Sequence, residues 1–246
     1  MLFADDISAT SIGLLLAFSF VMGLRHALEP DHLAAVSIIV SDKKSVWSSS
    51  LIGALWGVGH TIALLIAGIA VIAFHFEISE RLANLLELGV GVMLVLLGLE
   101  ALRKVLMGGG IHSHVHSHGS IVHAHPHVHD AEQVRAHSVA AHTHHGLNIS
   151  PKPLFVGMVH GLAGSGALML LILATIRSPA VAILYIVVFG TGSIGGMMIM
   201  SMLIGLPFHF TVQRFTRAEN WLRSAAGVFS LSFGVVWIAA LLPELL

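Results

Sequence analysis

Residues 23–32 read Gly23-Leu24-Arg25-His26-Ala27-Leu28-Glu29-Pro30-Asp31-His32, and they lie within an apolar run that covers residues 12–40. The stretch places two histidines, an arginine and two carboxylates in a segment that is otherwise apolar. An Arg or Asp near the centre of a membrane helix costs roughly 2.5–3.5 kcal/mol on insertion scales, so ionisable groups at this depth usually have a function. We interpret the stretch as a divalent-metal site within a broken transmembrane helix. The alternative is a polar helix end at the membrane interface, with ordinary salt bridges.

Pro30 decides whether these side chains can meet. On an unbroken helix, His26 would lie about 140° from Asp31 and about 120° from His32 around the axis. Proline removes a backbone donor and disfavours the α conformation of the preceding residue, here Glu29. A local unwinding could bring His26, Asp31 and His32 around one ion and free backbone carbonyl groups. Glu29 is a further candidate ligand or proton acceptor, unless it merely faces water.

The composition is that of a polytopic membrane protein. The 246 residues are 56% hydrophobic and 10% charged, whereas soluble domains carry about 25% charged residues. The net charge of −1 argues against nucleic acid as a partner, and the lipid bilayer is the expected one. The absence of Cys excludes disulfides, iron–sulfur clusters and thiolate metal sites. Residues 1–11 lack the basic start of a cleaved signal peptide, so we treat the first apolar run as part of the mature protein.

A membrane-spanning helix needs about 20 apolar residues, and the sequence offers about six such runs. They are residues 12–40, broken at Pro30, and residues 48–74, 82–106, 153–176, 180–206 and 221–242. We therefore expect an all-α polytopic membrane protein. Its first three-helix unit covers residues 1–107, a His-rich loop covers 108–150, and a second three-helix unit covers 151–246.

The basic residues predict the orientation. With the N-terminus outside, nine Lys and Arg residues fall on the inner side and two on the outer side. Cytoplasmic loops carry such an excess of positive charge. We expect the protein in the cell membrane, with both termini outside and the His-rich loop in the cytoplasm.

The two three-helix units resemble each other at three places in the same order. Residues 23–26 align with 157–160, residues 56–60 align with 189–193, and the pair Gly91 and Gly98 aligns with the pair Gly227 and Gly234. Because three is an odd number of spans, the second unit would be inverted relative to the first. Inverted repeats with broken helices are typical of transporters, whose site lies at the repeat interface.

Two further histidines are candidates for the same site. His60 follows Gly57 and Gly59, and glycines allow helices to approach closely. Its alternative role is a hydrogen bond to a neighbouring carbonyl. His160 aligns with His26, but the acid and the second histidine of the motif are missing from the second unit. A ligand or gating role for His160 therefore competes with a packing role.

The loop between the units holds a dense set of histidines. The candidate metal-buffering ligands are His112, His114, His116, His118, His123, His125, His127 and His129. Such a polar segment cannot form a core, so we expect it to be disordered. Neutral imidazoles suit Zn, Cu and Ni, which favours metal buffering over a plain solvated linker.

These motifs resemble the nickel/cobalt transporter (NiCoT) family and the wider NicO superfamily. The family's signature of Arg-His, four residues and Asp-His reads here as residues 25–32, and its Leu-Gly-His-Ser/Thr segment is similar to Leu55-Trp56-Gly57-Val58-Gly59-His60-Thr61. The resemblance implies transport of Ni²⁺ or Co²⁺. It also implies that His26, Asp31, His32 and His60 handle the metal.

The sequence departs from the typical permease of that family. Eight spans are typical there, against about six here. Small or acidic residues are usual where Glu29 and Pro30 stand. Glu-Pro with a His-rich loop is more similar to the nickel/cobalt efflux branch, although that branch tends to have Gly in place of Asp31. The short form is also similar to the urease-accessory group of NicO proteins.

We expect a secondary transporter of Ni²⁺ and/or Co²⁺ that works in uptake, has no resident cofactor and is not an enzyme. A cytoplasmic metallochaperone is a candidate partner. The sequence lacks the Gly-x-x-x-x-Gly-Lys-Ser/Thr motif of nucleotide hydrolysis and the His-Glu-x-x-His motif of a metalloprotease. Efflux is the main alternative, since the loop could collect metal for export. A membrane metal-sensing or storage protein and an intramembrane metalloenzyme are the others.

Overall fold

The computed structural model describes residues 9–41, 45–74, 79–107, 112–118, 121–127, 151–162, 176, 178–212 and 216–245. The helices are α1 (Ala9–His26), α2 (Pro30–Ser41), α3 (Val46–Phe74), α4 (Glu80–Leu106), α5 (Lys152–Gly161), α7 (Pro179–Val212) and α8 (Thr216–Leu245). The strands are β1 (His112–His118) and β2 (Ile121–His127).

The chain is an α-helical membrane protein. Among the described residues, four helices are long and apolar enough to cross a membrane, namely α3, α4 and most of α7 and α8. The pair formed by α1 and α2 makes a fifth if it is counted as one broken span. Large apolar side chains such as Leu14, Ile66 and Leu96 are exposed on these helices, as a lipid-facing surface requires. The predicted span at 153–176 falls on α5, which has ten residues, and on residues 163–175, which lie outside the described part.

The helix of the first apolar run is broken at the motif, as the proline predicted. α1 ends at His26, α2 begins at Pro30, and the two are bent by 56°. The Leu28 N–H donates to the Arg25 carbonyl at 2.9 Å, and the Glu29 N–H donates to the His26 carbonyl at 3.1 Å. These bonds over three residues tighten the end of α1. Proline suits the first position of α2 because an N–H there would have no partner within the helix.

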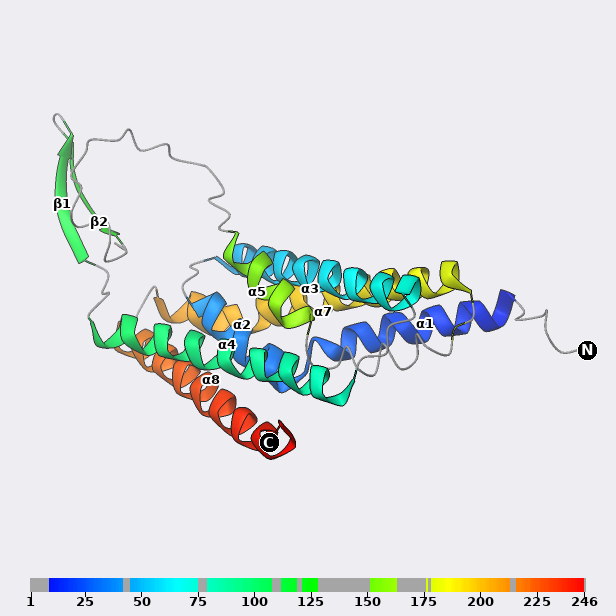
Figure 1. Ribbon diagram of the computed structural model, residues 1–246. Helices are drawn as coiled ribbons and strands as arrows, with labels where there is room; N and C mark the ends of the chain where they lie inside the picture. Colours follow the sequence, from blue (N-terminus) through cyan, green and yellow to red (C-terminus); the bar gives the residue numbers. More distant parts are fainter. Residues whose placement is uncertain are drawn as a thin grey trace, which may run out of the picture.

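The helices pack in a few close pairs (Figure 1). α7 packs along α3 and α1, α5 packs against α3, and α4 and α8 lie along each other. Glycines make two of these approaches possible. A Cβ at Gly23 of α1 would meet the Phe189 carbonyl oxygen of α7, and a Cβ at Gly157 of α5 would meet the Trp56 carbonyl oxygen of α3. Small residues let membrane helices come this close.

Two short stretches of the His-rich segment are described as strands. β1 and β2 pair as an antiparallel hairpin in which His112 is opposite His127 and His116 is opposite His123. The disorder of the loop as a whole stays a prediction. Histidine alternates with smaller residues in both runs, and Gly119-Ser120 separates them. Two alternating runs separated by Gly-Ser are typical of a β-hairpin. The loop candidate His129 lies outside the described residues.

Candidate metal site

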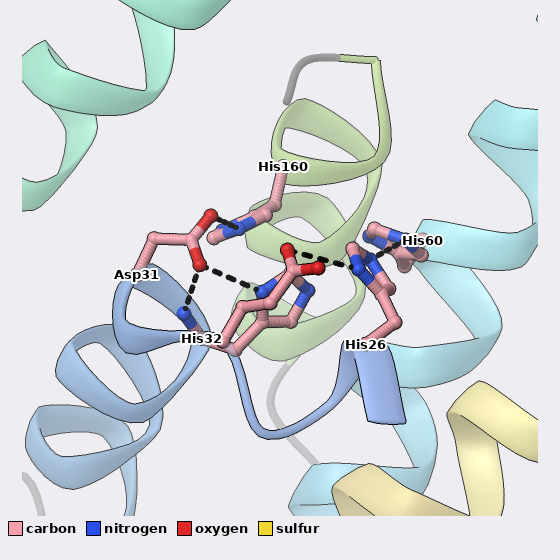
Figure 2. Close-up of polar contacts among 6 residues, drawn as sticks. His26, Asp31, His32, His60 and His160 are labelled. Atoms are coloured by element: carbon pink, nitrogen blue, oxygen red, sulfur yellow. Dashed lines mark hydrogen bonds and ion pairs between the residues drawn. The ribbon is translucent and has the colours of Figure 1, made fainter. Parts of the chain in front are cut away.

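Side chains from four helices converge at the break between α1 and α2 (Figure 2). His26 is the last residue of α1, Asp31 and His32 belong to the first turn of α2, His60 lies on α3, and His160 lies near the end of α5. All of them are buried, with exposed fractions between 1% and 8%. The structure thus brings together His26, Asp31 and His32 of the motif with the two histidines that were separate candidates.

These side chains form two overlapping groups that share His32. In the first group, ligand atoms of His26, His32 and His60 lie within 4.8 Å of one another. In the second group, ligand atoms of Asp31, His32 and His160 do so. The Nε2 atoms of His26 and His60 are 2.9 Å apart, and His160 Nε2 is 2.9 Å from Asp31 Oδ2. The site is therefore compact, with nitrogen donors on one side and mixed nitrogen and oxygen donors on the other.

Asp31 is oriented by its place at the start of α2. Its Oδ1 accepts a hydrogen bond from the His32 backbone N–H at 2.9 Å and lies 3.1 Å from His32 Nδ1. A carboxylate in the first turn of a helix is also favoured by the positive end of the helix dipole. The two oxygens of Asp31 therefore point to two different imidazoles, which fixes both rings around one acid.

Three buried nitrogens in the cluster have no hydrogen-bond partner within the described part of the chain. They are His32 Nε2, His60 Nδ1 and His160 Nδ1. Leaving a buried polar atom without a partner costs about 1–3 kcal/mol. Imidazole and carboxylate groups are the donors that divalent transition metals accept. The cluster is compatible with metal binding on these grounds.

Glu29 lies at the edge of the cluster. Its Oε2 is 3.1 Å from His26 Nδ1, and its side chain is 39% exposed. It belongs to neither of the two groups of possible ligands in the described residues. Its contact is with the other nitrogen of His26, which suits a residue that orients this ring or exchanges a proton with it.

Two aromatic side chains, Trp56 and Phe189, lie beside the imidazoles of the site, although neither was a candidate site residue. The Trp56 ring lies 5.2 Å from the His32 ring and 5.5 Å from the His160 ring, between centroids. The Phe189 ring lies 5.5 Å from the His26 ring. Apolar rings around charged groups lower the local dielectric and strengthen their interactions. The alignment of these two residues was the signal available in the sequence.

A comparison with known proteins identifies the family. The chain is 37% identical over 231 residues to the urease accessory protein UreH of Bacillus sp. (strain TB-90), and the alignment covers 94% of this chain and 92% of the relative. The chain belongs to the UreH family. This membership agrees with the similarity to the urease-accessory group that the short form had indicated. No family model matches the chain, and no solved structure matches it.

Proposed function

We propose that this member of the UreH family is a secondary transporter that carries Ni²⁺ and/or Co²⁺ into the cell. The observation that carries the proposal is the buried cluster of imidazole and carboxylate groups at the break between α1 and α2, the helix pair that could form one broken span. The relative's name supports it, because a urease accessory role implies nickel as the metal. An accessory role is also consistent with a protein that is not an enzyme.

The substrate ion would exchange its hydration shell for protein ligands in the cluster. The proposed ligands are His26, Asp31, His32, His60 and His160, and Glu29 would adjust His26 from the edge. A helix break in membrane proteins is tolerated where the irregular backbone is buried or lines a cavity, and such breaks hold substrate sites in transporters. The membrane potential would favour entry of a divalent cation by about 4.6 kcal/mol per 100 mV, twice the value for a single charge.

We also propose that the helices form two inverted three-helix units around this site. Two close contacts support this arrangement: Gly23 approaches the Phe189 carbonyl, and Gly157 approaches the Trp56 carbonyl. In the sequence alignment of the units, Gly23 matches Gly157 and Phe189 matches Trp56. The contact of α1 with α7 would therefore be the counterpart of the contact of α5 with α3.

The ring contacts follow the same relation. His26 lies 5.5 Å from Phe189, and His160 lies 5.5 Å from Trp56. His26 aligns with His160, and Phe189 aligns with Trp56. The cluster would then lie where the two units meet, which is the place of the substrate site in transporters built from inverted repeats.

The orientation follows from the basic residues, with both termini outside and the His-rich loop in the cytoplasm. In this arrangement the loop histidines would take up the ion after it leaves the cluster. A cytoplasmic metallochaperone could receive the ion from the loop.

Ion flux into proteoliposomes tests the proposal. The protein is reconstituted with its orientation resolved, and entry of Ni²⁺ and of Co²⁺ is followed under an imposed membrane potential. We expect His32→Ala to reduce flux about tenfold or more, because loss even of a group that only orients a metal ligand typically costs about 10- to 100-fold. His209→Ala, on α7 and outside the cluster, serves as the matched control and should leave flux unchanged. Full flux in a folded His32→Ala protein would refute the proposal, and flux in the outward direction alone would indicate efflux instead.

A further inference from the structure

We propose that the cluster offers the substrate ion two adjacent positions that are occupied in turn, with His32 common to both. The inference rests on the proposed function and deepens it. The first position is formed by His26, His32 and His60, and the second by Asp31, His32 and His160. The ion would pass from one to the other without leaving protein ligands.

The spacing of the rings separates the two positions. The His60 and His160 ring centroids are 6.0 Å apart, whereas His32 lies 5.3 Å from the first and 4.1 Å from the second. His60 is held against His26 by the 2.9 Å contact of their Nε2 atoms, and His160 is held against Asp31 at 2.9 Å. Each of the two outer histidines therefore has its own partner, and His32 lies between the pairs.

The two nitrogens of His32 have different surroundings. Nδ1 is 3.1 Å from Asp31 Oδ1, on the side of the second position. Nε2 is buried and has no hydrogen-bond partner among the residues that the structure describes. A neutral imidazole has one nitrogen that accepts and one that carries hydrogen. His32 can therefore bind one ion at a time, so the positions are alternatives rather than a two-ion site.

The donor sets give the positions different chemistry. The first has three imidazoles, and the second has two imidazoles and the Asp31 carboxylate. Carboxylate is the harder ligand and brings a negative charge, while imidazole suits the later transition metals. Passage through a membrane protein requires binding that is favourable enough for entry and weak or shared enough for release. Two adjacent positions that share a ligand satisfy both requirements.

Visible spectroscopy with Co²⁺ as the probe tests the inference. The background is the full-length chain with the histidines of residues 112–145 replaced by Asn, so that the loop does not bind the probe. We expect this protein to bind one Co²⁺ and to give a spectrum that is the sum of two forms. His60→Ala should give the form with Asp31, and His160→Ala should give the three-imidazole form. Both variants should keep Co²⁺ affinity within about tenfold, whereas His32→Ala should lose about 100-fold.

Transport separates the two-position arrangement from a single centre. His60→Ala and His160→Ala should each lose more than about tenfold of their flux while they still bind Co²⁺, because the ion can no longer be handed over. Identical spectra from these two variants, or two Co²⁺ ions bound together in the background protein, would overturn the inference. An absence of Co²⁺ binding in the background protein would instead count against the proposed function. Helical circular dichroism and His209→Ala control for folding.

Discussion

Gly157 has no side chain at the point where α5 meets α3. A Cβ at this position would meet the carbonyl oxygen of Trp56 and would lie 2.6 Å from Cδ1 of its ring. That ring also contacts His32 and His160. The packing of α5 on α3 at Gly157 therefore affects the positions of the side chains in the cluster. A change of one methyl group at this position therefore reaches the candidate ligands.

We predict that Gly157→Ala destabilises the protein by about 1–3 kcal/mol, the usual cost of overpacking. The displaced Trp56 ring should also weaken Co²⁺ binding. Gly89→Ala on α4 is the matched control, since a Cβ there would have nothing within 4 Å. It should be neutral or stabilise by about 0.5–1 kcal/mol, because alanine favours helix over glycine. Thermal unfolding in detergent measures both, and equal stability of the two variants would contradict the steric role.

The break between α1 and α2 is the element on which the cluster depends. A continuous helix would direct His26 and the α2 residues to different sides, about 120–140° apart. The bend of 56° removes this separation and lets α3 and α5 add one histidine each. Pro30 has no backbone N–H, so it cannot continue the hydrogen bonds of α1.

We predict that Pro30→Ala weakens Co²⁺ binding by about 10- to 100-fold while it leaves overall helix content unchanged or slightly higher. The alanine N–H could donate to the His26 carbonyl and allow a straighter helix. Pro243→Ala, which removes a proline from inside α8, controls for the general effect of losing a proline. Equal Co²⁺ affinity in the two variants would show that the surrounding helices, and not the proline, impose the bend.

The break and the candidate ligands could be predicted from the sequence because proline chemistry and apolar length act locally. His60 and His160 could be nominated from their glycine neighbours and from the match between the units. The division of the cluster into two groups could not, because it depends on where α5 meets α2. The positions of Trp56 and Phe189 beside the imidazoles also depend on packing between segments that are far apart in the sequence.

At the scale of the molecule, the cluster and the His-rich segment are separate features. The cluster is formed by residues of α1, α2, α3 and α5, and Phe189 of α7 lies beside it. The hairpin of β1 and β2 projects away from the helices (Figure 1). In the proposed function, the helices move the ion and the loop stores it. Substitutions in the cluster should therefore alter transport, and changes to the loop should alter metal storage.

We predict that deletion of residues 108–146 leaves most of the flux of Ni²⁺ into proteoliposomes, since no proposed ligand of the cluster is removed. Metal retention in cells should fall, because the imidazoles that suit nickel are lost. His32→Ala should do the reverse: flux should fall about tenfold or more, while the purified protein still binds metal through the histidines of the loop. Loss of both properties on deletion would favour the storage alternative over transport.

The glycine contacts have a mechanical consequence. Where α1 meets α7 and α5 meets α3, backbone touches backbone, and no bulky groups at Gly23 or Gly157 interlock the surfaces. If these helices move during transport, such contacts would let one helix tilt on another with little rearrangement of side chains at the glycines. The aromatic rings beside the imidazoles would then be the bulkiest groups that resist this tilt. The same few contacts would affect both the affinity for the metal ion and the rate of transport.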